Sequence, residues 1–200
     1  MRSRLARLAP AALLLLLACQ PRTAAPVFGP WEEGLTLNYE DPSAPQPKRS
    51  AERLQVRVAK ATFTPGSPSL IQVDMASSQG QLPLTFKYDR GGIALVDGQG
   101  EVVRQILPAG FPAVDQWTDH GIQFRLMGRA TWEGATILPA TADPVGYWVE
   151  ARTPKGLVRR TLYLPNLGEV ESREQRDGAW VTISRLVARG FTDIPAIKRS

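Results

Sequence analysis

Cys19 and His120 are the single cysteine and the single histidine among these 200 residues, and they limit the chemistry that the chain can perform. One cysteine cannot form an internal disulfide, and zinc sites of the common kinds need several cysteine or histidine ligands. A catalytic triad of serine, histidine and aspartate would have to use His120, which lies in the turn-like segment 118–121, where a solvated loop residue is expected. The sequence therefore predicts no metal site, no cofactor and no catalytic residue.

Carboxylate side chains leave one enzymatic alternative open. Glycoside hydrolysis uses two carboxylates that flank the scissile bond, and Glu150, Glu169 and Glu171 are candidates by residue type. Their separation is a property of the folded chain, so the sequence does not decide it. The common nucleotide-binding, hydrolase and metalloprotease motifs are missing from the chain. We therefore expect a protein that is not an enzyme and keep a carbohydrate-active enzyme as the alternative.

The C-terminal third of the chain contains the most suggestive set of binding residues. On one predicted strand, Trp148 lies in phase with Glu150 and Arg152 and opposite the apolar positions, while Trp180 occupies the polar phase of a later strand. Aromatic faces beside charged groups can hold a sugar ring, a peptide or a lipid headgroup, so we predict a ligand site at these four residues. The alternative is that the two indoles pack across a barrel seam or under the loop 115–121, with cations over them.

The first nineteen residues indicate where the protein resides. A positively charged start leads into the apolar run 11–18, which ends at Cys19, as in a secretory signal. The segment 16–19 resembles the lipobox of bacterial lipoproteins, with an aliphatic residue first and a small residue directly before the cysteine. The resemblance implies removal of residues 1–18, attachment of a lipid to Cys19 and a mature protein held at a membrane surface. The alternatives are a plain cleaved signal and a transmembrane anchor, although the run is shorter than the about 20 residues that span a bilayer.

The residue after the cysteine limits the expected location of the protein, and the net charge limits its expected partners. In some bacteria an aspartate after the lipidated cysteine retains lipoproteins at the inner membrane, and here that residue is Gln20. We therefore expect the outer membrane, facing the periplasm, with the cell surface or the outer leaflet of the inner membrane as alternatives.

Three of the cations lie in residues 1–18, so the formal charge falls from +5 to +2 in the mature chain. This charge gives no basic footprint for a nucleic acid.

The remaining sequence has a strand-like pattern. Residues 19–30 hold prolines and no periodicity, which predicts a flexible tether, and residues 31–200 form a single predicted domain. Apolar and polar residues alternate with a period of two in many segments, and turn signals recur every dozen residues or so. We predict an all-β domain, a single antiparallel meander of about ten strands curled into a barrel or half-barrel, with a β-sandwich as the alternative. The segment 108–117 is either a lid or a packed loop.

One hairpin is specific enough to predict its register. Asp177-Gly178 is a strong signal for a two-residue hairpin loop. In that register Arg173 faces Thr182, and the period of two places Ser184 in phase with Trp180.

Location and domain class together suggest a function. We expect a membrane-anchored envelope lipoprotein whose non-catalytic β domain binds another envelope protein, a glycan or a lipid. A lipid or lipoprotein carrier with an apolar cavity is an alternative, because size and tethering are similar to those of the outer-membrane lipoprotein receptor family. That family packs helices against a curved sheet, and no helix is predicted here.

Overall fold

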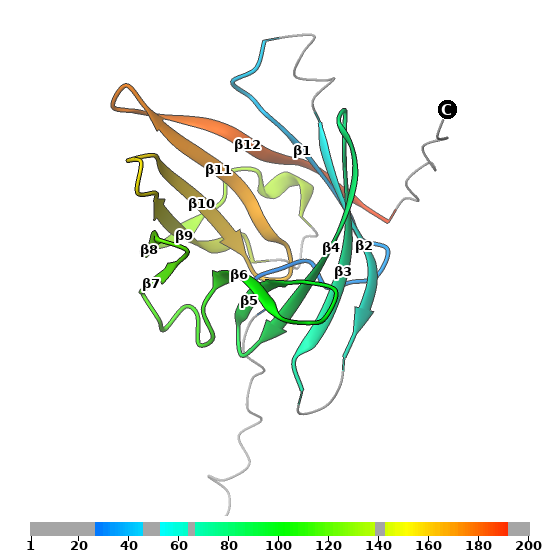
Figure 1. The fold of residues 1–200 in the computed structure, drawn as a ribbon. Helices are drawn as coiled ribbons and strands as arrows, with labels where there is room; N and C mark the ends of the chain where they lie inside the picture. Colours follow the sequence, from blue (N-terminus) through cyan, green and yellow to red (C-terminus); the bar gives the residue numbers. More distant parts are fainter. Residues whose placement is uncertain (1–26, 46–52, 64–66, 139–142, 192–200) are drawn as a thin grey trace, which may run out of the picture.

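A computed structural model describes residues 27–45, 53–63, 67–138 and 143–191, and within these ranges the chain is almost entirely β structure (Figure 1). The one helical element of the described residues is a short 3-10 turn, η1 (Ala135–Ile137). The strands are β1 (Thr36–Glu40), β2 (Leu54–Thr62), β3 (Ser69–Ser77), β4 (Gly80–Asp89), β5 (Gly92–Val96), β6 (Val102–Leu107), β7 (Gln116–Asp119), β8 (Ile122–Thr131), β9 (Val145–Arg152), β10 (Val158–Leu164), β11 (Gly168–Arg176) and β12 (Ala179–Gly190).

All of these strands belong to one antiparallel sheet that is nearly closed into a barrel. The strand order is β6-β5-β4-β3-β2-β1-β12-β11-β10-β9-β8-β7, so strands that are consecutive in sequence pair with each other except for β6 and β7, and the first strand also pairs with the last. The prediction of an all-β meander curled into a barrel is confirmed, with twelve described strands where about ten were expected. The sandwich alternative is wrong because these strands form one sheet.

The period of two explains why these segments form strands. On β3, Ile71 and Val73 are buried while the intervening Gln72 is exposed, so one face of the strand packs into the core. The hairpin between β11 and β12 has positive φ at both Asp177 and Gly178, which is the geometry of a type I′ loop. The register predicted from that loop, with Arg173 opposite Thr182, is confirmed.

The barrel has a seam between β6 and β7, the two edges of the sheet. A side-chain hydrogen bond links the edges: the backbone N–H of Gln105 on β6 donates to Oδ1 of Asp119 at the end of β7, at 3.1 Å. The connection between these strands contains Phe111, which is buried against Phe28 and Trp117. The predicted lid or loop is therefore a packed loop, and it fills the barrel near the seam.

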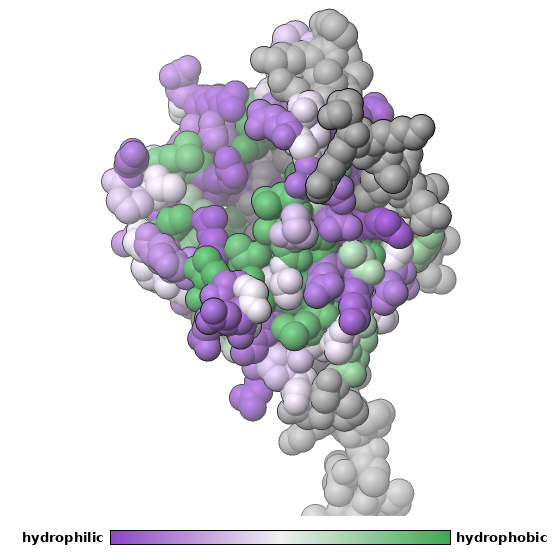
Figure 2. Space-filling model, turned by 45° about the vertical axis from the view of Figure 1, so that its right-hand side comes forward, coloured by the Kyte–Doolittle hydropathy of each residue, from purple (hydrophilic) through white to green (hydrophobic). Residues whose placement is uncertain are grey.

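The start of the described chain packs into the barrel. Phe28 is fully buried, and the backbone carbonyl of Val27 accepts a hydrogen bond from the N–H of Asn166. Residues 27–30 of the predicted tether are thus packed, whereas Cys19 and the predicted signal lie outside the described residues. On the side of the molecule in Figure 2, apolar side chains gather around a central hollow and hydrophilic side chains surround them. No helix in the described ranges has the length and apolar character needed to cross a membrane.

Candidate ligand sites on the two faces of the sheet

A β-bulge in β11 sends two glutamates to opposite faces of the sheet. Glu169 pairs with Tyr163 of β10, and Glu171 pairs with Leu162, so Val170 is an extra residue between them. Tyr163 and Leu162 are adjacent in a regular strand, and adjacent residues point to opposite faces. Without the bulge, two glutamates two positions apart would share a face. Glu169 instead lines the barrel cavity, and Glu171 lies on the face away from it.

On the outer face, Glu171 is held between two arginines. Its Oε1 accepts a hydrogen bond from Nε of Arg173 at 2.6 Å, and its Oε2 accepts one from Nε of Arg185 at 3.2 Å. The glutamate side chain is only 3% exposed, while both arginines are more than a third exposed. The buried carboxylate is therefore fully paired, and it fixes the position of the two guanidinium groups above it.

A second carboxylate on this face has a similar role. Oε2 of Glu150 accepts from Nε of Arg160 at 3.0 Å and lies 2.9 Å from Nη2 of the same residue. Nη2 of Arg152 lies 3.6 Å from Oε1 of Glu150, but Arg152 is mostly exposed at the end of its strand. Arg160 and Arg173 are direct partners in the register of β10 and β11, so two guanidinium groups lie side by side, each held by its own carboxylate.

Each of these arginines also stacks on a tryptophan. The guanidinium carbon of Arg160 lies 4.2 Å from the ring centre of Trp180, and that of Arg173 lies 4.9 Å from the ring centre of Trp148. These four side chains and Met127 line a pocket of about 210 Å³. We call Trp148, Trp180, Arg160 and Arg173, with Glu150 and Glu171 beneath them, the tryptophan–arginine face.

The structure brings two of the four residues of the predicted ligand site to this pocket. Trp148 and Trp180 do line one pocket, but they lie on β9 and β12, which are separated by two strands and are not neighbours. Sequence reasoning missed the role of Arg173, although the predicted hairpin register already placed it on the face of Trp180. The ligand-binding role of the four predicted residues stays a prediction.

A second bulge corrects the predicted phase of β12. Ser172 pairs with Ser184 and Arg173 pairs with Thr182, so Ile183 is an extra residue. Ser184 therefore lines the cavity, whereas Thr182 stays on the face of Trp180. The period of two fails here for the same physical reason as at Val170.

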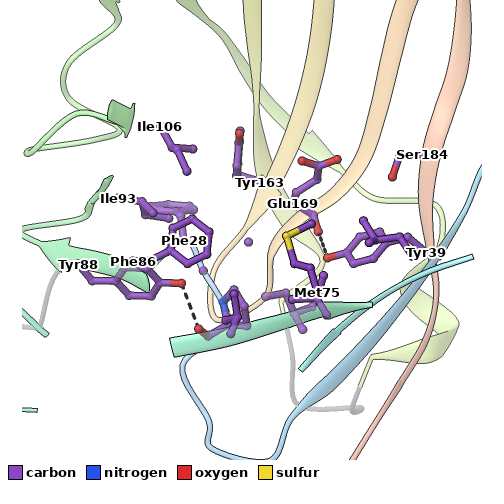
Figure 3. A pocket seen from close by; sticks show the side chains of 17 residues that line it. Phe28, Tyr39, Met75, Phe86, Tyr88, Ile93, Ile106, Tyr163, Glu169 and Ser184 are labelled. Atoms are coloured by element: carbon purple, nitrogen blue, oxygen red, sulfur yellow. Dashed lines mark hydrogen bonds between the residues drawn. The ribbon is translucent and has the colours of Figure 1, made fainter. Parts of the chain in front are cut away.

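The other face of these strands lines a partly open cavity of about 190 Å³ (Figure 3). Its lining comes from both halves of the barrel and is mostly apolar, with a few polar groups on one side. The residues are Phe28, Gly29, Pro30, Tyr39, Leu54, Val56, Val73, Met75, Phe86, Tyr88, Ile93, Ile106, Tyr163, Leu167, Gly168, Glu169 and Ser184.

Glu169 is the acidic residue among the lining residues. Its Oε1 accepts a hydrogen bond from the hydroxyl of Ser172 at 2.9 Å, and the Ser172 and Thr161 hydroxyl oxygens lie 2.8 Å apart. Burial raises the pKa of Glu169 above its ordinary value, although the Ser172 hydrogen bond and the charge of Arg159 oppose that change. The hydroxyl of Tyr39 donates to the Glu169 backbone carbonyl at 2.7 Å, so the backbone here is fixed by a buried tyrosine.

The tyrosines of the cavity stay protonated at all ordinary pH values, so their hydroxyls can donate hydrogen bonds. Burial raises the pKa of Tyr39, of Tyr88 and of Tyr163 well above the usual range. The hydroxyl of Tyr88 donates to the carbonyl of Pro30 at 3.1 Å. Two of these hydroxyls therefore hold backbone around the cavity.

His120 lies at the seam, away from both sites. It is 72% exposed in the β7–β8 turn, and its Nδ1 lies 3.1 Å from Oδ2 of Asp119. Burial of Asp119 opposes its ionised form, but hydrogen bonds from His120 and the Gln105 amide outweigh it and lower the pKa of the carboxyl. Within the described ranges, no group of three or more histidine, cysteine, aspartate or glutamate residues is placed to hold a metal ion.

Comparisons with known proteins support the fold. No protein-family model and no curated protein sequence matches the chain. A solved structure from Bacteroides fragilis, named as an exported protein with a YMCC-like fold, matches with a TM-score of 0.51 at 15% identity, covering 82% of this chain and 99% of its own. A Parabacteroides distasonis protein named as a lipoprotein matches with a TM-score of 0.48 at 13% identity, covering 83% and 99% of the two chains. At these identities the likeness to the first structure is a likeness of fold.

Proposed function

We propose that this chain is a lipid-anchored protein of the bacterial cell envelope whose β domain catalyses no reaction and binds an acidic ligand on the tryptophan–arginine face. The leader and Cys19 support the anchor, and the structural neighbour that is named as an exported protein agrees with a place in the envelope. Gln20 after the cysteine favours the outer membrane, with the domain in the periplasm.

The observation that carries the binding proposal is the pair of adjacent arginines on this face. Like charges that lie directly opposite on neighbouring strands destabilise a sheet, yet Arg160 and Arg173 are register partners. Four arginines accompany two glutamates here, because Arg152 and Arg185 join the two ion-pair clusters. The face therefore keeps an excess of positive charge, which an anion bound between the guanidinium groups would neutralise.

The tryptophans narrow the class of anion. Both indoles line the same pocket as the arginines, so the ligand should combine an acidic group with a flat, partly apolar surface. An acidic glycan has both features, since its carboxylates suit the arginines and its ring faces suit the indoles. Among the protein, glycan and lipid partners that the sequence leaves open, we therefore propose a glycan.

The geometry gives less support to the two alternatives. Glu150 and Glu171 are each occupied by arginines, and Glu169 lies on the opposite face, so these carboxylates do not flank a common site as a glycosidase requires. The cavity of about 190 Å³ is smaller than the roughly 300–1,000 Å³ of pockets that enclose drug-sized ligands. This size does not suit the acyl chains of a lipid carrier.

The anchor is tested with Cys19→Ser in the full chain, expressed in a bacterium and followed by membrane fractionation. We expect the native protein in the outer-membrane fraction and the variant in the soluble periplasmic fraction, with Gln20→Ser as a control that keeps the cysteine. Mass spectrometry of the native N-terminus should show Cys19 carrying lipid. Equal membrane retention of the Cys19→Ser variant would overturn the anchor.

The ligand is tested by calorimetric titration of the full chain in lipid nanodiscs. We expect oligogalacturonate to bind, maltooligosaccharide of equal length to bind weakly, and added salt to weaken the acidic ligand because the attraction is ionic. The double variant Trp148→Ala/Trp180→Ala should lose about tenfold or more in affinity, or about 1.4 kcal/mol. Phe63→Ala, which removes an exposed aromatic ring elsewhere, should change nothing. Equal binding of both oligosaccharides would contradict the proposal, and binding of anionic vesicles instead would identify a headgroup site.

A further inference from the structure

The interior cavity is a second site, on the face of the sheet opposite the tryptophan–arginine face. We propose that it binds a small ligand that has an apolar body and one positively charged nitrogen, with the nitrogen at Glu169. This inference does not depend on the proposed function, because the residues involved face the other way and the ligand has the opposite charge.

The volume of the cavity sets the size of the ligand. An apolar cavity of about 150 Å³ in another protein is large enough to bind benzene, and the cavity here measures about 190 Å³. It therefore accepts one ring or a short branched hydrocarbon with a single small substituent. Phe28, Phe86 and Tyr88 supply aromatic walls for such a body.

The electrostatics of the cavity set the charge of the ligand. Among the described residues, the Glu169 side chain accepts one hydrogen bond, from Ser172 to Oε1, whereas a carboxylate can accept about four. Arg159 influences Glu169 only at a distance and forms its ion pair with Glu174, at 3.5 Å. No ion pair to Glu169 is found among the described residues, although Glu171, two positions along the strand, has two. A ligand cation would complete this site, and aromatic walls favour a cation as well.

The raised pKa of Glu169 predicts how binding of a cation should depend on pH. Without a cation, burial favours the protonated carboxyl, while a bound cation favours the carboxylate. Binding of an amine should therefore strengthen as the pH rises and the acid ionises, over a range in which the amine itself stays protonated. A neutral ligand of the same shape should show no such dependence.

The test uses the full chain in lipid nanodiscs and three probes of nearly equal size: benzylamine, benzyl alcohol and benzoate. Ligand-observed NMR titrations against empty nanodiscs give the affinities. At pH 8 we expect benzylamine to bind most tightly, benzyl alcohol more weakly and benzoate least. In Glu169→Gln the advantage of benzylamine over benzyl alcohol should fall at least tenfold, with benzyl alcohol unchanged. From pH 5 to pH 8 the native protein should gain affinity for benzylamine only.

Two further variants separate the cavity from the surface. Met75→Trp fills the cavity and should abolish binding of all three probes, while Glu174→Gln removes a carboxylate of the same strand outside the cavity and should change nothing. Thermal unfolding confirms that each variant is folded. The proposal is overturned if the folded native protein binds none of the probes, if Glu169→Gln keeps the preference for benzylamine, or if Met75→Trp binds as the native protein does.

Discussion

Glu169 and Glu171 are two positions apart on β11, yet their carboxylates differ in their hydrogen-bond partners and in the polarity of their surroundings. Glu171 accepts hydrogen bonds from two arginines that are themselves partly solvated. Glu169 accepts one from a hydroxyl and faces a cavity with mostly apolar walls. One bulge residue, Val170, produces the difference by sending the two side chains to opposite faces. A single inserted residue in a strand thus separates Glu171, which is paired within the fold, from Glu169, which keeps the capacity to accept hydrogen bonds from a ligand.

The comparison shows that, on each face, some charged groups are paired within the fold and others keep the capacity to bind a ligand. On the outer face, both glutamates are paired with arginines whose remaining N–H groups can still donate, so we expect this face to recognise an anion. In the cavity, Glu169 carries the open capacity to accept hydrogen bonds, so we expect this site to recognise a cation. If the two faces of the same strands bind opposite charges as we propose, variants of the two glutamates should respond oppositely to substitution and to pH.

The largest effect is expected for Glu171→Gln. The substitution removes the charge that accepts hydrogen bonds from Arg173 and Arg185. Hydrogen bonds to charged groups contribute about 1.5–3 kcal/mol each, so weakening two of them should cost about 3 kcal/mol. Urea unfolding of the variant should show a loss of about that size relative to the native protein at neutral pH.

Glu174→Gln is the matched control for burial. Glu174 also contacts two arginines, Arg159 and Arg176, but its side chain is 16% exposed against 3% for Glu171. We expect a loss below about 1 kcal/mol, as for surface pairs. If the two glutamine variants lose equal stability, burial of Glu171 does not make its ion pairs contribute more to stability than those of Glu174.

The fold was predictable from the sequence because alternation and turn residues are local signals. The register at Asp177-Gly178 followed from the φ values that such a loop requires. The bulges at Val170 and Ile183 were not predictable, because polar and apolar residues alternate without a break through both positions and the extra residue is set by pairing across the sheet. The pairing of β1 with β12, and the cavity between distant strands, depend on contacts that the local pattern does not encode.

Asp119 is a paired carboxylate at the seam, and we expect its substitution to have an effect between those at Glu171 and Glu169. Asp119→Ala removes hydrogen bonds from the Gln105 amide and His120, and hydrogen bonds to charged groups contribute about 1.5–3 kcal/mol. Because the folded-state pKa of Asp119 is lowered, its contribution is present above its ordinary pKa and is lost as the pH falls. Unfolding measured from pH 7 down to pH 3 should show a cost of about 2 kcal/mol that shrinks with acidification. A constant cost would mean that the seam does not depend on this charge.

The unpaired acid should show the opposite pH dependence. The folded-state pKa of Glu169 is raised, so its protonated form stabilises the fold at low pH and this stabilisation is lost as the pH rises through that pKa. Glu169→Gln resembles the protonated acid and should be more stable than the native protein at pH 8, by about 1 kcal/mol for relief of a poorly paired buried group. The two proteins should unfold alike at pH 4. Equal stability at both pH values would show that Glu169 is adequately solvated, and that the surroundings of Glu169 and Glu171 do not differ in their effect on stability.

The smallest effect concerns the stacking of Arg160 on Trp180, which orders the outer face without burying charge. A double-mutant cycle with Arg160→Met and Trp180→Leu isolates the pair, because each substitution keeps apolar bulk and removes one partner. A cation–π contact at a partly exposed site contributes about 0.5–1 kcal/mol, and the 4.2 Å separation is close enough for that value. The coupling from urea unfolding should lie in this range and persist at high salt better than the Arg152–Glu150 pair, whose exposed charges are 3.6 Å apart. A coupling of zero would mean that the carboxylates alone position the arginines, and the tryptophans would then be available to a ligand without any stabilising role.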